Sequence, residues 1–129
     1  MNESMPIVRD QLPDDLQDLL PLTAAVFFIL FALADGEKHG YAIMQSVSGL
    51  SGDTFRMGPG TLYTTIQRLL ELDLIEEAER VGGKSDHESR RKYYRLTRSG
   101  TEVLEAEVDR MESVVRLARD KKLAVRTAE

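Results

Sequence analysis

The chain has 129 residues, of which 42% are hydrophobic and 30% charged, a formal net charge of −5, and neither cysteine nor tryptophan. This length is sufficient for one domain with a substantial core. Because cysteine is absent, disulfides and thiolate metal sites are excluded. The two histidines, His39 and His87, are too few for a histidine-rich centre, so we expect no metal and no cofactor.

The chain shows no membrane or export signal. Its longest apolar run, residues 24–34, has eleven residues, whereas a membrane-spanning helix needs roughly 20. The N-terminus lacks the basic start and apolar stretch of a signal peptide. We therefore expect a cytoplasmic protein that does not enter a membrane.

The negative net charge argues against a nucleic-acid partner, but the charges are unevenly distributed. Residues 1–53 carry 2 basic and 8 acidic side chains, whereas residues 80–98 carry 7 basic and 2 acidic ones. A basic segment in an acidic chain indicates a local anionic partner. A solvated surface loop is the alternative interpretation of the same charges.

The first part of the chain predicts a loose tail and two helices. Residues 1–11 show no periodicity, and a short amphipathic helix is expected from Pro13 until Pro21 breaks it. The leucines on its apolar face are Leu12, Leu16, Leu19 and Leu20. Thr23 can cap a second helix from residue 24 to about residue 34. That helix is apolar on every side and needs cover, most simply from a partner subunit.

The middle of the chain predicts two further helices. Residues 35–40 are expected to form a turn, followed by a helix over residues 41–50 and a Gly/Ser connector over residues 48–53. Pro59 marks the first turn of a helix that runs to about Leu72. The apolar face of this helix consists of Leu62, Ile66, Leu69 and Leu70.

The last part predicts a hairpin and a long helix. Two strand-like segments, residues 74–81 and 91–97, flank a polar loop over residues 82–90. Hairpin loops usually have about 2–5 residues, so this longer loop predicts a projecting wing. A helix is expected over residues 101–125. Its apolar residues have the spacing of a coiled-coil seam, namely Leu104, Val108, Met111, Val115 and Ala118.

The order of these elements predicts the fold. Three helices, a strand, a charged loop, a second strand and a final helix are typical of a winged helix-turn-helix. The expected fold class is therefore mainly α with a small β-hairpin, a winged helix-turn-helix followed by a long C-terminal dimerisation helix.

Three sequence blocks in fixed order support this topology: ADGEKHGYAIMQ, GPGTLYTTIQRLLELDLIEE and SRRKYYRLTRSGTEVL. With these blocks the chain resembles the PadR family of transcriptional regulators over roughly residues 22–123. The single C-terminal helix is similar to that of the smaller PadR subclass, whose members dimerise through this helix and an N-terminal helix. Thr64 departs from the pattern, since many members have proline there.

The resemblance implies a sequence-specific DNA-binding regulator, most simply a repressor, that binds an inverted-repeat operator as a homodimer. Residues 21–98 would bind DNA and residues 99–129 would dimerise. Residues 1–20 form an acidic extension that is less typical of the family, and its charge predicts that it weakens non-specific DNA affinity. No phosphate loop or catalytic triad is visible, so we expect no enzyme activity. A winged-helix protein-interaction module without specific DNA binding is the alternative.

The predicted DNA contacts form three groups. The polar face of the fourth helix offers short side chains, a glutamine for adenine and an arginine for guanine or phosphate. Its members are Gly60, Thr61, Thr64, Gln67 and Arg68. The resemblance implies that Tyr41 and Tyr63 also lie at the DNA surface. The phosphate partners expected from the wing are Lys84, Arg90, Arg91 and Lys92. Without the resemblance, an ordinary solvated helix face would be the preferred interpretation of the first group.

Two apolar groups are expected at the dimer interface. They are the aromatic residues of the second helix and the seam of the last one: Phe27, Phe28, Phe31, Leu104, Val108, Met111, Val115 and Ala118. A small hydrophobic or aromatic effector is hypothesised to bind where the phenylalanines meet the C-terminal helix. Some small PadR proteins hold flat aromatic compounds with tryptophan, which this chain lacks.

The remaining histidine and tyrosine residues have structural interpretations. His39 is expected to be a turn or cap residue, and His87 a wing residue near phosphate. Tyr93 and Tyr94 are expected to pack within the hairpin rather than stack on bases.

Overall fold

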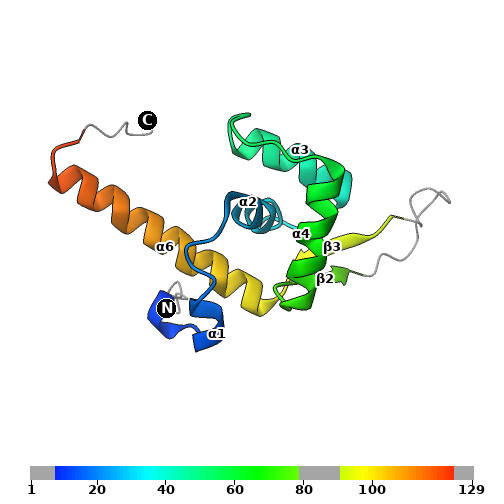
Figure 1. The fold of residues 1–129 in the computed structure, drawn as a ribbon, viewed down its shortest axis with the longest axis horizontal. Coiled ribbons are helices and arrows are strands. Elements are labelled where there is room, and N and C mark those ends of the chain that lie inside the picture. The colour runs from blue at the N-terminus through cyan, green and yellow to red at the C-terminus, as the bar shows by residue number, and fades with distance from the viewer. Residues whose placement is uncertain (1–7, 79–90, 124–129) are drawn as a thin grey trace, which may run out of the picture. The chain divides into compact units, whose positions relative to one another are not determined.

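The computed structural model describes residues 8–78 and 91–123 (Figure 1). The chain divides into two compact units, Met1–Pro21 with Glu102–Glu129, and Leu22–Thr101. The long helix α6 (Arg98–Asp120) begins in the second unit and continues into the first. Each unit is described by itself below.

The unit Leu22–Thr101 combines three helices with a small sheet. The helices are α2 (Ala24–Ala32), α3 (Gly40–Leu50) and α4 (Pro59–Glu71). The strands are β1 (Lys38–His39), β2 (Ile75–Ala78) and β3 (Tyr93–Leu96). Helix α2 packs against α3 and α4, and the antiparallel sheet has the order β1-β3-β2. The predicted fold class, mainly helical with a small β element and a long C-terminal helix, is confirmed.

Strand β1 corrects the prediction of a turn over residues 35–40. The chain turns through Gly36, and the next residues pair with β3, Lys38 opposite Tyr94 and His39 opposite Tyr93. Two residues are too few to show the alternation that predicts a strand. This strand forms because β3 supplies its partner from more than fifty residues away.

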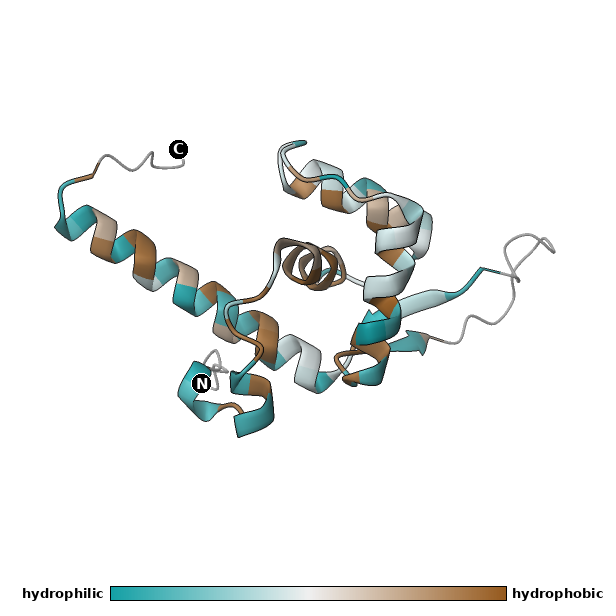
Figure 2. Cartoon of the chain, in the orientation of Figure 1, coloured by the Kyte–Doolittle hydropathy of each residue, from teal (hydrophilic) through white to brown (hydrophobic). Residues whose placement is uncertain are grey.

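Helix α2 begins as its sequence predicts, since Thr23 Oγ1 accepts a hydrogen bond from the amide of Val26 at 3.3 Å. It ends at Ala32, earlier than expected. Figure 2 shows that it is hydrophobic on all sides, yet the same chain buries Ile29 and Leu30 completely and leaves Phe31 37% exposed. Most of the cover expected from a partner subunit therefore comes from the chain itself.

A row of aromatic rings connects α2 with the turn before α4. Phe27 lies 5.3 Å from Phe31 and 5.1 Å from Phe28 between ring centroids. Phe28 stacks on Phe55 at 5.9 Å. The amide of Phe55 donates to the hydroxyl of Ser51 at 3.1 Å, which holds the turn in place. Four rings thus join the exposed side of α2 to the segment that leads into α4.

The C-terminus of α4 is closed by a left-handed residue. Asp73 has φ 58°, the amide of Leu74 donates to the carbonyl of Leu69 at 3.0 Å, and both leucines are fully buried. This hydrogen bond satisfies a carbonyl that the end of the helix would otherwise leave without a donor. It also sets the direction of the chain into β2. The observed helix bounds agree with the prediction of a helix from Pro59 to about Leu72.

Helix α6 starts against the corner formed by Asp73 and Leu74, where the chain leaves α4 for β2. Its first residue lies three positions before the predicted start. The Thr97 hydroxyl donates to the carbonyl of Asp73 at 2.6 Å and accepts from the amide of Gly100 at 3.0 Å. A Cβ at Gly100 would collide with the carbonyl oxygen of Leu74. Only glycine allows the helix to come this close to the corner.

The unit formed by the two ends of the chain joins the N-terminal segment to α6. Its N-terminal elements are η1 (Arg9–Gln11) and α1 (Asp14–Gln17), drawn in blue in Figure 1. Leu12 and Leu16 are buried, and Gln17 Nε2 donates to the carbonyl of Leu12 at 2.8 Å. The predicted loose tail is therefore partly wrong, because residues 8–11 contain a 3-10 turn. Residues 1–7 lie outside the described part of the chain.

The apolar residues of α6 change from buried to exposed along the helix. Val103, Leu104 and Ala106 are buried, whereas Val108 is 45% and Val115 38% exposed. Beyond its end, Lys122 has φ 64° and the amide of Leu123 donates to the carbonyl of Ala118 at 2.9 Å. The helix thus ends at Asp120 rather than continuing to residue 125. A left-handed residue and a hydrogen bond across the last turn are the usual way to end a helix.

Candidate nucleic-acid interface

Helix α4 separates its apolar and polar residues. Leu62, Ile66 and Leu69 are buried. The predicted contact residues on the other face are all exposed, namely Gly60, Thr61, Thr64, Gln67 and Arg68. Thr65 on the flank is occupied within the helix, because its hydroxyl donates to the carbonyl of Thr61 at 2.7 Å. The helix therefore presents a continuous polar surface.

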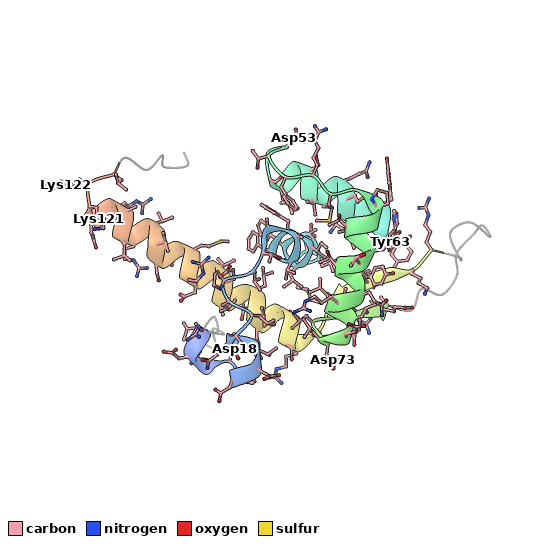
Figure 3. All side chains as sticks on the ribbon, in the orientation of Figure 1. Asp18, Asp53, Tyr63, Asp73, Lys121 and Lys122 are labelled. Carbon is pink, nitrogen blue, oxygen red and sulfur yellow. The ribbon has the colours of Figure 1, made fainter. Side chains whose placement is uncertain are left out.

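Tyr63 links α4 to the start of α3 (Figure 3). Its side chain is 52% exposed, and its hydroxyl lies where a Cβ at Gly40 would be. A larger residue at position 40 would therefore displace the side chain of Tyr63. The tyrosine of the neighbouring HGY motif, Tyr41, is 61% exposed.

His39 connects α3 with the base of the hairpin. Its Nδ1 accepts from the amide of Ala42 at 3.2 Å, which caps α3 as predicted. Its ring lies edge-on to Tyr93, with centroids 5.3 Å apart. Its Nε2 lies 3.2 Å from Nη1 of Arg91, a residue fifty-two positions further along the chain. The sequence indicated the cap, but not this connection.

The cations near the hairpin differ in how closely they pair with acidic side chains. Arg95 Nε bonds Glu76 Oε2 at 2.8 Å, whereas Lys92 Nζ lies 3.8 Å from Glu77 Oε2 and is 69% exposed. At that distance and exposure, the attraction of Lys92 to Glu77 is weak. Lys92 is therefore available to a stronger anion, while Arg95 is held in the sheet.

The two hairpin tyrosines pack inside the fold, as predicted. Tyr94 is only 4% exposed. Its burial, followed by the charges of Glu77 and Tyr63, raises the pKa of its hydroxyl above the usual value. Tyr93 is half-buried against the ring of His39.

A hollow of about 330 Å³ brings several predicted residues together. Its lining consists of His39, Gly40, Tyr41, Tyr63, Arg91, Lys92 and Tyr94. Two predicted wing residues, Lys84 and Arg90, lie outside the described residues, as does His87. The sequence motifs identified the tyrosines and the basic segment, but periodicity could not indicate that they share one hollow.

The residues predicted for dimerisation have different environments. Phe27 and Leu104 are buried in their own chain, and Phe28 stacks on Phe55. Met111 and Ala118 are half-buried. Exposed apolar side chains on α6 include two that the seam pattern did not predict, Val114 at 52% and Leu117 at 59%. The open apolar surface of α6 is therefore wider than a coiled-coil seam.

A second groove, of about 470 Å³, lies at the C-terminal ends of α2 and α3. It is lined by Phe31, Ala32, Ala34, Asp35, Ser46, Gly49 and Leu50. Of the three phenylalanines expected around an effector, only Phe31 belongs to this lining.

The described part of the chain contains neither a membrane-spanning helix nor a cluster of metal-binding side chains. In residues 8–78 and 91–123, no helix has both the length and the apolar character needed to cross a membrane. The same residues contain no group of three or more histidine, cysteine or acidic side chains arranged to hold a metal ion.

The order of helices, the three-stranded sheet and the exposed face of α4 define a winged helix-turn-helix protein. The model of the Transcriptional regulator PadR-like family matches residues 29–106. The chain belongs to this family, which confirms the resemblance seen in the sequence.

Known relatives agree with this assignment. Transcriptional regulator Rv3488 of Mycobacterium tuberculosis is 37% identical over 90 residues, which cover 68% of this chain and 76% of the relative. A PadR family regulator of Clostridium difficile has a TM-score of 0.63 at 23% identity, covering 76% of this chain and 97% of the other. Bacillus subtilis PadR, crystallised with operator DNA, has a TM-score of 0.57 at 20% identity, covering 77% and 61%.

Three further curated relatives match over part of their length. The chain spans 23%, 63% and 38% of the length of three further curated relatives, at 30–39% identity.

Proposed function

We propose that this chain is a cytoplasmic, DNA-binding transcriptional regulator that reads duplex DNA with α4. The observation that supports this proposal is the exposed polar face of α4 opposite its buried leucines. A recognition helix lies in the major groove, with its N-terminal residues against base edges. On this face, Gln67 can bond adenine and Arg68 can bond guanine or phosphate.

The hairpin base is proposed to hold the DNA backbone beside α4. Arg91 and Lys92 are exposed cations at this position, and such contacts add affinity without reading sequence. Lys84 and Arg90, outside the described residues, are proposed as further phosphate partners in the wing. The family membership and the operator complex of Bacillus subtilis PadR support this arrangement.

Binding to the DNA upstream of the protein's own gene tests the proposal. In a fluorescence anisotropy titration over several salt concentrations, we expect sequence-preferring binding that weakens as salt rises. Arg68→Ala should cost about 1–3 kcal/mol of binding free energy. Arg119→Ala is the control, because it removes another exposed arginine, on α6. Binding without salt or sequence dependence would refute the proposal.

We further propose a homodimer that binds an inverted repeat. Two recognition helices about 34 Å apart would then read two half-sites one helical turn apart. The exposed apolar surface of α6, which includes Val108 and Val115, supports a helix-to-helix contact between subunits.

Light scattering and operator titration test the dimer. Val115→Glu should place a charge in the interface and give a monomer with much weaker operator binding. Ser113→Glu adds the same charge outside the predicted seam and should leave the dimer intact. A Val115→Glu protein that remains a dimer at micromolar concentration would contradict this interface.

We propose that the dimer acts as a repressor. A ligand that favours a second arrangement of the two subunits, in which the recognition helices no longer match the half-sites, would release it from DNA. The effector is proposed to be a small hydrophobic or aromatic compound. The groove beside Phe31 supports this proposal, because its volume of about 470 Å³ suits a small ligand. Operator affinity that stays unchanged across a panel of aromatic compounds would count against an effector.

The protein-interaction alternative predicts a different outcome for the double variant Arg68→Ala with Arg91→Ala. A regulator loses operator binding and keeps its oligomeric state. An interaction module that binds no specific DNA shows the same DNA affinity before and after the change.

A further inference from the structure

Arg56 lies in the segment between α3 and α4, and this segment is held at both ends. Before it, the amide of Phe55 donates to the Ser51 hydroxyl at 3.1 Å, and the Phe55 ring stacks on Phe28. After it, Gly58 is the N-cap residue of α4. The backbone at Arg56 is therefore constrained before any partner arrives, which lowers the entropy cost of binding through its side chain.

The side chain of Arg56 is not used by the fold. Phe55 and Met57 on either side are half-buried, whereas Arg56 is exposed. In the described part of the chain, no hydrogen bond or ion pair engages its guanidinium group. The nearest acid in the sequence, Asp53, accepts a hydrogen bond from the Ser48 hydroxyl at 2.6 Å instead. A guanidinium group that offers only donors is thus left to an anion from outside the chain.

The charges beside α4 differ between its two ends. Arg56 gives the start of the helix one positive charge. At the other end, Arg68 is outnumbered by Glu71 and Asp73, which are both exposed. A phosphate backbone is therefore attracted to the start of α4 and repelled from its end. This polarity agrees with a recognition helix whose N-terminal residues meet the base edges.

The position of Arg56 also suits the dimensions of DNA. The major groove is about 12 Å wide, so a helix at its centre lies about 6 Å from the phosphates on either side. The two residues from Arg56 to Gly58 span at most about 7 Å. The side chain of Arg56 can therefore reach the edge of a groove that the start of α4 has entered. Its planar fork of donors matches two oxygens of one phosphate group.

We propose that Arg56 binds a phosphodiester group of the DNA backbone at the edge of the groove that α4 enters. This inference rests on the proposed DNA binding and adds a contact that belongs neither to the polar face of α4 nor to the wing. Because it holds a phosphate, the contact fixes the position of α4 in the groove without reading sequence.

Two substitutions at Arg56 separate its charge from its shape. Arg56→Gln removes the charge and should keep the wild-type melting temperature, because the fold does not use this side chain. We expect it to bind operator and unrelated duplex about tenfold more weakly. Its slope of log K against log salt should become less steep by about 0.9 for each subunit bound. Arg56→Lys keeps the charge, so it should keep the slope and lose less affinity.

Arg119→Gln is the control for net charge. It also removes one positive charge from an exposed arginine, but on α6. We expect its salt slope to equal that of the wild type. A control that lowers the slope as much as Arg56→Gln does would assign the effect to net charge and overturn the proposed contact.

Chemically altered DNA distinguishes a phosphate contact from a base contact. A set of operator duplexes carries one neutral methylphosphonate linkage at successive positions. At one position in each half-site the wild type should lose about tenfold in affinity, while Arg56→Gln should lose nothing further. An Arg56→Gln protein that binds operator more weakly but unrelated duplex as tightly as the wild type would show that Arg56 reads a base, which overturns the proposal.

The outcomes also separate this inference from the proposed function. A wild type that binds DNA, with a folded Arg56→Gln variant of equal affinity and salt slope, overturns the inference alone. A wild type that binds no duplex overturns both.

Discussion

At Gly100, the addition of a single carbon atom would disturb the fold. Replacing it with alanine would push Cβ into the carbonyl oxygen of Leu74, which is backbone and cannot turn away. We expect Gly100→Ala to lower the free energy of unfolding by about 1–3 kcal/mol, measured by urea denaturation. Gly49→Ala in α3 is the control, since nothing lies near its Cβ. It should stabilise the protein by roughly 0.5–1 kcal/mol, and equal effects of the two changes would contradict the contact.

Tyr94 makes stability depend on pH at the alkaline end. Burial, with the charges of Glu77 and Tyr63, raises the pKa of its hydroxyl in the folded chain. The unfolded chain therefore ionises Tyr94 first, so its contribution is complete below the unfolded pKa, about 10, and is lost as pH rises further. We expect the wild type to lose more stability between about pH 9 and pH 11 than Tyr94→Phe does. Parallel urea titrations of the two proteins measure this difference, and equal slopes would exclude Tyr94 as the cause.

At the level of elements, the Thr97 hydroxyl bridges the residue after α4 and the first turn of α6. Thr97 bonds the carbonyl of Asp73 and the amide of Gly100. We expect Thr97→Ala to cost about 1–2 kcal/mol of unfolding free energy, because it removes a helix cap and a bond between elements. Thr97→Ser keeps the hydroxyl and should lose much less. Similar losses in thermal unfolding for serine and alanine would assign the effect to the methyl group instead.

At the level of the whole molecule, the N-terminal segment contributes both charge and packing. Asp10, Asp14, Asp15 and Asp18 are exposed, whereas Leu12 and Leu16 are buried. Deleting the segment would therefore remove core residues together with the charge. Changing the four aspartates to asparagine alters the net charge from −5 to −1 and keeps the leucines.

We expect the variant with all four substitutions to bind unrelated duplex DNA more tightly at low salt, because fewer negative charges repel the DNA. The difference should disappear at high salt, where exposed charges are screened. Anisotropy titrations at two salt concentrations check this result. An unchanged affinity at low salt would show that the acidic extension does not influence DNA binding.

Local signals predicted the elements that depend on local chemistry. Thr23 and Pro59 marked helix starts, and the spacing of Leu62, Ile66 and Leu69 predicted the buried face of α4. The sequence did not predict β1, whose partner strand is distant.

The missed parts of the site have the same physical cause. The contact of His39 with Arg91 and the approach of Tyr63 to Gly40 join residues that are far apart in the chain. Periodicity describes one element at a time, so it cannot indicate such contacts. The hollow therefore became visible only in three dimensions.

The row of phenylalanines has a mechanical consequence for α4. Phe31 is exposed beside the groove at one end, and Phe55 lies in the turn before Gly58 at the other. Close-packed side chains resist compression, so a displacement of one ring is passed to its neighbours in the row. A shift of Phe31 is therefore expected to reach Phe55, in the turn that leads into Gly58 at the start of α4.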